Sequence, residues 1–408
     1  MNVEVKEHIK KIDGGILTPK GFMAEGIHAG LRYSHNDLGI IYSEVPAKAA
    51  AVYTLNAYQA APIQVTKESI AKNGHLQALV VNSACANACT GERGLKDAET
   101  MRASVAEKLG LSNYDVAVAS TGVIGQFLDI DKITAGIKKI ELKKDQSGAE
   151  GFEKAILTTD TCTKKCAFEA EIDGVTVSMG GAAKGSGMIH PNMATMLGFV
   201  TTDANIEQKS LERALRKVTD VSFNQITVDG DTSTNDMVLV MANGEAGNEL
   251  LSENHPDWQV FLSLLKETCE CLAKKIARDG EGATKLVEVQ VAGAETDDEA
   301  KVIAKTVIAS NLVKTAVYGA DANWGRIVGA MGTSNIPFNQ ERVSISFGPV
   351  EVLHHGNPVI FDEEKARHYL LGDNVQIFIQ LADGLGTGKA WGCDLTYDYV
   401  KINASYRT

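Results

Sequence analysis

Segments typical of strands and segments typical of helices alternate along most of this chain, and this alternation constrains its fold more than any other feature. Residues 77–82, QALVVN, contain a short apolar run and are predicted to form a buried strand. Apolar residues recur at every second position around Val289 and Ile377, which predicts half-buried strands. A helix is predicted from Pro256, a residue suited to a first turn, to a stop at Gly280. The mixture predicts an α/β fold.

The length and charge of the chain exclude several classes of protein. The 408 residues are enough for two or three domains. The net charge of −12 argues against a nucleic-acid partner, which would require a basic surface. No apolar run approaches the roughly 18 residues of a membrane helix, and the first 15 residues are polar. We therefore expect a cytoplasmic protein without a membrane partner.

Seven cysteines are present, an odd number in a chain without a visible secretory signal. This favours free thiols over a disulfide framework. The spacings are CxxxC twice and CxC once, and no paired histidines accompany them. The sequence therefore predicts no metal site.

Residues 184–203, KGSGMIHPNMATMLGFVTTD, form the segment most suggestive of chemistry. Glycines lie on both sides of the pair Ala194 and Thr195, and glycine permits sharply bent backbone. A Thr hydroxyl is a weak nucleophile unless a base removes its proton, and the α-amino group of an N-terminal Thr can be that base. Thr195 would therefore first cleave the bond after Ala194 by attacking that carbonyl. The alternative is that Thr195 is an ordinary strand residue.

The same segment closely resembles the signature of the ornithine acetyltransferase family, also called bifunctional glutamate N-acetyltransferases. Further matches are ILTTDT at 156–161, SFNQITVDGDTSTND at 222–236, RDGEGATK at 278–285, GADANWGRI at 319–327 and DLTYDYVKINASYRT at 394–408. Because these matches occur in order over the whole chain, neither chance nor a merely shared fold explains them.

The resemblance implies an α/β sandwich of sheets and helices, similar to N-terminal-nucleophile hydrolases but with different connections. It implies a precursor that cleaves itself into an α chain, residues 1–194, and a β chain, residues 195–408. The family transfers acetyl from N-acetylornithine to glutamate through an acetyl-Thr intermediate, in cyclic arginine biosynthesis. It uses no metal or organic cofactor. Acetyl-CoA is a second donor in some members, and an α2β2 assembly is the family expectation.

The resemblance also implies the residues of the site. Thr121 and Gly122 match the oxyanion pair, although the local sequence alone favours a simple strand–helix turn with Ser or Thr as a cap. The substrate-binding positions are Thr158, Lys184, Thr195, Glu281, Asn403 and Thr408. Thr159 and Thr161 could be confused with Thr158. Lys184 and Glu281 offer opposite charges, as an amino-acid substrate requires.

Two further patterns are interpreted as structural. Residues 383–390 resemble a phosphate-binding loop, but Asp383 and Ala390 break its pattern, so we predict a glycine turn. His190 lacks a spaced acid that would suggest a catalytic triad. One departure from the family is Ala84-Cys85, where the family pattern has Gly-Asn. If that loop lines the site, substrate fit could differ.

Two other functions remain as alternatives. Self-cleaving aminopeptidases of the same fold family use a Ser nucleophile, whereas this chain has Thr195. A catalytically silent binding or regulatory protein would not need the intact Thr195 and Thr121 motifs.

Overall fold

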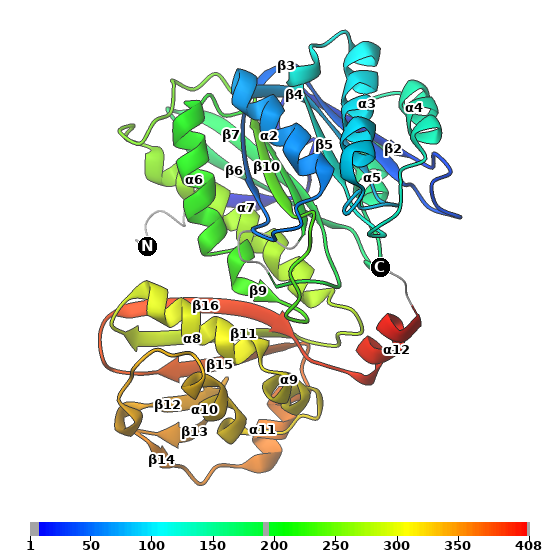
Figure 1. Cartoon of the computed structure of the whole chain (residues 1–408). Helices are drawn as coiled ribbons and strands as arrows, with labels where there is room; N and C mark the ends of the chain where they lie inside the picture. Colours follow the sequence, from blue (N-terminus) through cyan, green and yellow to red (C-terminus); the bar gives the residue numbers. More distant parts are fainter. Residues whose placement is uncertain (1–7, 191–195, 406–408) are drawn as a thin grey trace.

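Two mixed β-sheets with helices on their faces make up the structure (Figure 1). This computed structural model describes residues 8–190 and 196–405. Its layers of sheets and helices confirm the α/β sandwich predicted from the sequence.

The first sheet has nine strands within the described ranges, in the order β1-β6-β7-β8-β10-β3-β4-β5, with β2 beside β3. The strands are β1 (Ile9–Ile12), β2 (Phe22–Ile27), β3 (Leu38–Tyr53), β4 (His75–Asn82), β5 (Val116–Ser120), β6 (Lys164–Ile172), β7 (Val175–Lys184), β8 (Leu197–Thr202) and β10 (Met237–Ala242). The helices of this half are α2 (Ala61–Asn73), α3 (Gly91–Leu109), α4 (Ile130–Lys139), α5 (Gln146–Ala155), α6 (Gln208–Asp220) and α7 (Trp258–Arg278).

Both faces of this sheet are buried at its centre. On β10, Val238 and Val240 belong to the core beneath α6 and α7, whereas Leu239 and Met241 belong to the opposite core with Phe152 of α5. Successive side chains of a strand point to opposite faces, so a strand covered on both sides must be apolar throughout. The sequence of β10, MVLVMA, meets this requirement.

The second sheet has seven described strands in the order β14-β13-β12-β15-β11-β16-β9. They are β9 (Ile226–Thr227), β11 (Leu286–Ala294), β12 (Ser344–Phe347), β13 (Val350–His354), β14 (Asn357–Pro358), β15 (Asn374–Gln380) and β16 (Gly386–Cys393). Its helices are α8 (Asp297–Ala309), α9 (Asn311–Tyr318), α10 (Trp324–Gly332) and α11 (Glu363–Leu370), and α12 (Tyr397–Ser405) ends the described chain. The alternating apolar residues of β11, β12 and β15 face the core formed with these helices.

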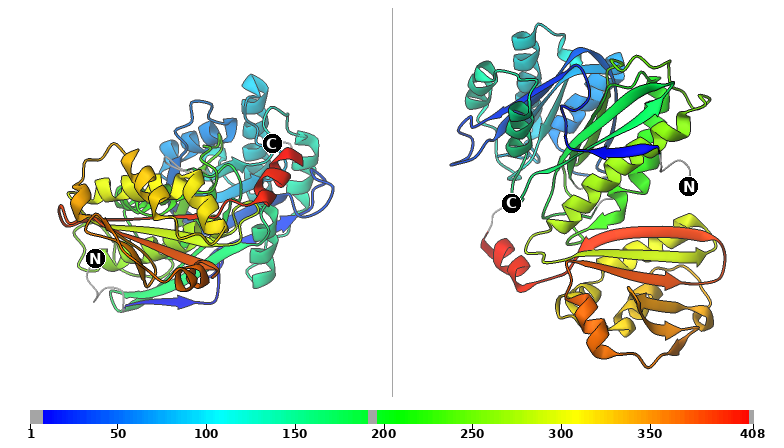
Figure 2. Two further views of the ribbon diagram at one scale, coloured as in Figure 1. Left: turned by 90° about the horizontal axis from the view of Figure 1, so that it is seen from below. Right: turned by 180° about the vertical axis from the view of Figure 1, so that it is seen from behind.

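Helix α7 connects the two halves. It packs on β6 and β7 of the first sheet and also contacts β16 of the second (Figures 1 and 2). Trp391 of β16 is 1% exposed and belongs to the same hydrophobic core as Leu272 of α7. Since one core reaches both sheets, the halves are joined by apolar packing as well as by the chain.

Most of the predicted elements are confirmed, with two corrections. The buried strand at 77–82 and the alternating strands around Val289 and Ile377 are present as β4, β11 and β15. Pro256 lies outside the helix: Trp258 N–H donates to the carbonyl of His255 at 3.0 Å, which places Pro256 in the preceding turn. Proline favours this second turn position.

The prediction of a glycine turn at 383–390 is only partly right, because β16 begins at Gly386. Its glycines have a packing role, since a Cβ on Gly386 would lie 2.3 Å from the backbone of Thr296, and one on Gly388 2.4 Å from the nitrogen of Lys301. Helix α8 therefore lies directly on this strand. None of the helices in the described ranges is long and apolar enough to cross a membrane.

We expect truncation of Phe152 to destabilise the first half strongly. Phe152 is fully buried, and its ring lies 5.7 Å from that of Phe199 on β8, edge to face. Phe152→Ala should lower the free energy of unfolding by about 3–5 kcal/mol in urea denaturation. Tyr33→Ala, at a fully exposed position, should change it by less than about 0.5 kcal/mol. Equal effects of the two variants would contradict this description of the core.

Candidate active site

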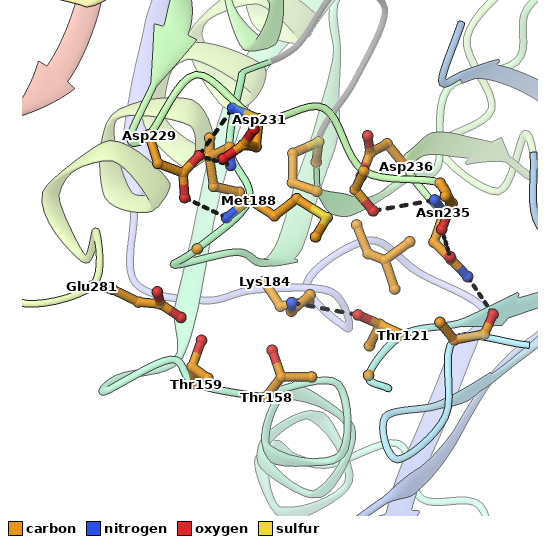
Figure 3. Close-up of a pocket in the computed structure, with 18 of the residues that line it drawn as sticks. Thr121, Thr158, Thr159, Lys184, Met188, Asp229, Asp231, Asn235, Asp236 and Glu281 are labelled. Carbon is orange, nitrogen blue, oxygen red and sulfur yellow. Dashed lines mark hydrogen bonds between the residues drawn. The ribbon is translucent and has the colours of Figure 1, made fainter. Parts of the chain in front are cut away.

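One pocket of about 230 Å³ gathers residues from distant parts of the sequence (Figure 3). Its lining includes six residues singled out from the sequence, namely Thr121, Gly122, Thr158, Lys184, Glu281 and Asn403. The other three, Ala194, Thr195 and Thr408, lie outside the described residues. Met196, which follows Thr195 in the chain, also lines the pocket.

The Thr121–Gly122 turn lies where β5 ends. The backbone N–H of Thr121 donates to the carbonyl of Asn82 at 2.9 Å, which anchors the turn to the neighbouring strand β4. Gly122 has φ of 121°, and a Cβ there would lie 2.4 Å from the carbonyl oxygen of Ala84. Glycine is therefore required here for both conformation and space.

The segment that departs from the family pattern supports this turn from outside. Val123 N–H donates to the carbonyl of Ala84 at 3.2 Å, and Cys85 is bridged to Val123. The Cys85 thiol donates to the carbonyl of Gln126 at 2.9 Å. Ala86 lines the pocket, whereas Ala84 and Cys85 are not among its lining residues. The departure thus lies behind the Thr121–Gly122 turn and not among the residues that line the pocket.

Lys184 ends β7 and points into the pocket (Figure 3). Its ammonium donates to the hydroxyl of Thr121 at 3.5 Å and lies 3.9 Å from Asp160 Oδ2. Burial lowers the pKa of Lys184, although Asp160 opposes this shift. A buried cation bonded to Thr121 supplies positive potential where an oxyanion would form.

A buried ionic network fixes the elements around Lys184. The Lys164 ammonium lies 2.6 Å from Asp160 Oδ1 and 2.6 Å from Asp279 Oδ2. Asp160 also accepts hydrogen bonds from the backbone N–H groups of Thr158, at 2.9 Å, and Gly185, at 2.6 Å. Burial disfavours the charge of Asp160, but the attraction of Lys184 and Lys164 outweighs it and lowers the pKa of Asp160 to about 2. The network was missed from the sequence, although Asp160 lies in the matched ILTTDT motif.

Glu281 also lines the pocket and is held by two segments, Ser186–Gly187 and α12. Its backbone N–H donates to the carbonyl of Ser186 at 3.0 Å, and Asn403 Nδ2 donates to its Oε2 at 2.7 Å. A Cβ on Gly187 would lie 2.4 Å from the Glu281 carboxylate, so this position needs glycine. The carboxylate therefore faces the same pocket as Lys184, as a substrate with both charges would require.

The structure also separates the neighbouring threonines. Thr158 and Thr159 both line the pocket, whereas Thr161 donates its hydroxyl and its backbone N–H to Asp279 and is not among the lining residues. The assignment of Thr158 is therefore compatible with the structure, and Thr159 shares its position at the pocket.

Further acidic residues complete the pocket and were not singled out from the sequence. Asp229, Asp231 and Asp236 line it, and all three belong to the matched stretch 222–236. Asp229 accepts from the backbone N–H groups of Met188, at 2.6 Å, and Ile189, at 2.8 Å, and so positions the chain before residue 190.

His190 is not among the lining residues, in keeping with its structural interpretation. Its Nδ1 lies 2.9 Å from the hydroxyl of Thr227. Burial is the main cause that lowers the pKa of His190 to about 4.

A tight oxyanion-type turn, a buried lysine and an opposing carboxylate around one pocket have the chemistry of an acyl-transfer enzyme acting on a small charged molecule. The chain belongs to the ArgJ family, whose model matches residues 23–408. It is 62% identical over 396 residues to the arginine biosynthesis bifunctional protein ArgJ of Geobacillus kaustophilus, with 97% of each chain covered. It is 61% identical over 403 residues to that of Bacillus subtilis, with 99% of each covered.

A solved structure supports the same assignment. The crystal structure of the arginine biosynthesis bifunctional protein ArgJ from Bacillus halodurans is 60% identical and has a TM-score of 0.51. The match covers 52% of the present chain and 100% of the chain in that crystal structure. The family predicted from the sequence is confirmed, and with it the class of enzyme, an acetyltransferase of arginine biosynthesis.

We expect Asp160→Asn to remove stability that depends on pH. Because the folded pKa of Asp160 lies below its ordinary value, its stabilisation is present above about pH 4 and is lost as the pH falls through about 2. The variant should therefore be less stable by about 2–3 kcal/mol at pH 7, and this difference should shrink towards pH 2. Urea denaturation across that range measures it, and the exposed Asp373→Asn serves as control. A deficit that does not change with pH would contradict the ionic role.

Proposed function

We propose that this chain moves an acetyl group from N-acetylornithine to glutamate through an acetyl-Thr195 intermediate. The observation that carries the proposal is the convergence of Thr121, Gly122, Lys184 and Glu281 on one pocket with Met196. Thr195 is bonded to the nitrogen of Met196, so one peptide unit separates the proposed nucleophile from a pocket-lining residue.

The first step is cleavage of the chain itself. The Thr195 hydroxyl attacks the Ala194 carbonyl and the C–N bond breaks, which frees the α-amino group of Thr195 as it takes up the hydroxyl proton. Water then hydrolyses the resulting ester and frees the Thr195 hydroxyl and the carboxylate of Ala194. That amine, with an ordinary pKa of about 7.7–8.0, then accepts the hydroxyl proton when Thr195 attacks the acetyl donor. We propose that neither a metal nor an organic cofactor takes part.

The pocket residues then have separate roles. Thr121 and Gly122 stabilise the negative oxygen of the tetrahedral intermediate, with Lys184 adding positive charge through its contact with Thr121. Glu281 binds the ammonium group of ornithine, and Thr158 and Asn403 line the space beside it. Thr408 is proposed to contribute from the C-terminus. Ornithine leaves, and glutamate takes the acetyl group from Thr195.

The proposed α chain, residues 1–194, and β chain, residues 195–408, would remain together after cleavage. The break falls between β7 and β8, which pair antiparallel from Met179 opposite Thr202 to Lys184 opposite Leu197. Strands β8 and β10 of the β chain lie between β7 and β3 of the α chain. Separation would expose the core of the first sheet, so the α and β chains act as one unit, and two such units form the proposed α2β2 assembly.

The proposal extends to a second acetyl donor and to the cell compartment in which the protein works. Acetyl-CoA is a second candidate donor, which an assay with acetyl-CoA and glutamate would test directly. The seven cysteines are free thiols, consistent with the reducing cytoplasm as the proposed compartment.

Thr195→Ala should give an uncleaved chain without transferase activity, because both steps need the hydroxyl. Mass spectrometry under denaturing conditions should show two fragments for the wild type, joining at Ala194 and Thr195, and one of 43.6 kDa for the variant. After incubation with N-acetylornithine, the acetyl mass should appear on the β chain. A wild type that stays uncleaved yet transfers acetyl groups, or acetylation of a cysteine alone, would contradict the mechanism.

Thr121→Ala should lower kcat by about 100- to 1,000-fold, since it removes one donor aimed at the oxyanion. KM for N-acetylornithine should change little, because the interaction strengthens only in the transition state. Thr134→Ala on α4, outside the pocket, provides the control. A loss confined to KM would assign Thr121 to ground-state binding instead.

A further inference from the structure

Asp236 is a buried acid of the pocket that the roles described above do not use. It directly precedes β10 and is 2% exposed. The next residue, Met237, donates its backbone N–H to the carbonyl of Met196 at 2.9 Å, and Met237 is paired with Leu197 in the parallel ladder. The chain at Asp236 thus lies beside Met196 and the start of β8 at Leu197, and Asp236 lines the pocket (Figure 3).

The hydrogen bonding of this carboxyl group is incomplete. Ser233 favours its charged form, but its Oδ2 is buried and has no hydrogen-bond partner within residues 8–190 and 196–405. A buried oxygen without a partner is costly, and at a pocket wall a bound ligand is the group that can satisfy it.

Its surroundings favour the protonated form. Burial raises the pKa of Asp236 well above its ordinary value, against the opposing effects of Ser233 and Lys184. The other titratable groups that line the pocket are Lys184 on β7, Asp229 and Asp231 in the loop before Asp236, Glu281 after α7 and Tyr399 on α12. Lys184 is already bonded to Thr121 and paired with Asp160, whereas Oδ2 of Asp236 has no hydrogen-bond partner in the part of the chain that the structure describes.

We propose that Asp236 is a further catalytic residue, which gives a proton to the amine that leaves the donor and takes one from the amine that attacks the acyl enzyme. The inference rests on the proposed acetyl transfer. As the donor C–N bond breaks, the Asp236 O–H bond breaks and a new N–H bond forms on ornithine. When the glutamate amine attacks acetyl-Thr195, its surplus proton returns to the Asp236 carboxylate. The α-amino group of Thr195 meanwhile takes and returns the hydroxyl proton, so both groups are restored after one cycle.

The test compares two donors that differ in how much their leaving groups need a proton. An amine leaves N-acetylornithine only when protonated, whereas p-nitrophenolate leaves p-nitrophenyl acetate as an anion. Asp236→Asn keeps the shape of the side chain but carries no transferable proton. With N-acetylornithine its kcat should fall by about 100- to 10,000-fold. The rate of p-nitrophenolate release in the first turnover, before glutamate attacks the acyl enzyme, should stay within about fivefold of the wild type.

A matched control is available in α3. Asp97 is also buried, and its Oδ2 also has no hydrogen-bond partner among the described residues, but it does not line the pocket. Asp97→Asn should leave both rates within about twofold. Equal losses of Asp236→Asn with both donors, or no loss with either, would overturn the proton-transfer role. Failure of the wild type to acetylate glutamate from N-acetylornithine would instead refute the proposed function.

Self-cleavage provides the second measurement if Asp236→Asn stays uncleaved, because that reaction also expels an amine. In that case Asp236→Glu, which retains a proton-carrying group, should produce the two fragments, and both variants should unfold at the temperature of Asp97→Asn. A Glu variant that is folded but also uncleaved would overturn the inference.

Discussion

The buried ammonium of Lys164 is the interaction on which the site depends. It joins Asp160, which holds the Thr158 loop and Gly185, to Asp279, which lies two residues before Glu281. The loop after α5, the end of β7 and the end of α7 are thereby fixed against one another. Removing any of the three charges would leave buried charge unpaired, which is far more costly than losing an exposed ion pair. A substrate pocket with charges on opposite walls requires such rigidity, because its groups come from separate elements.

The position of the proposed cleavage explains how one chain can be cut without falling apart. The bond lies between two paired strands at the centre of the first sheet, and α7 continues the same core to the second sheet. Cutting there would create a new N-terminus one residue before the pocket-lining Met196, and the β7–β8 ladder would stay paired. The proposed chemistry thus breaks only the peptide bond between Ala194 and Thr195. The hydrogen bonds between β7, β8 and β10 keep the two chains together.

The sequence predicted the strands well where one simple pattern sufficed. Apolar and polar residues alternate in β11 and β15, where mainly one face of the strand is buried. The apolar run of β4 corresponds to a strand buried on both faces. Thr121, Lys184 and Glu281 were predicted because the resemblance identified them, not because their local sequence is distinctive. Asp160, Lys164 and Asp236 were missed, since an acid beside threonines and a lysine at a strand start are ordinary in sequence. Their roles arise from burial, which only the packed structure reveals.

The sequence by itself determined the α/β class, the family and the residue types available for acyl transfer. These follow from periodicity and ordered motifs, which are local properties of the chain. The tertiary structure decided which of those residues meet, how far each carboxyl group is buried and which oxygen remains without a partner. Burial converts identical side chains into different groups: the pKa of Asp160 beside two lysines is lowered, whereas the pKa of Asp236 is raised by desolvation. That difference depends on the distances between elements far apart in the sequence, and it is fixed only when the two sheets and α7 pack together.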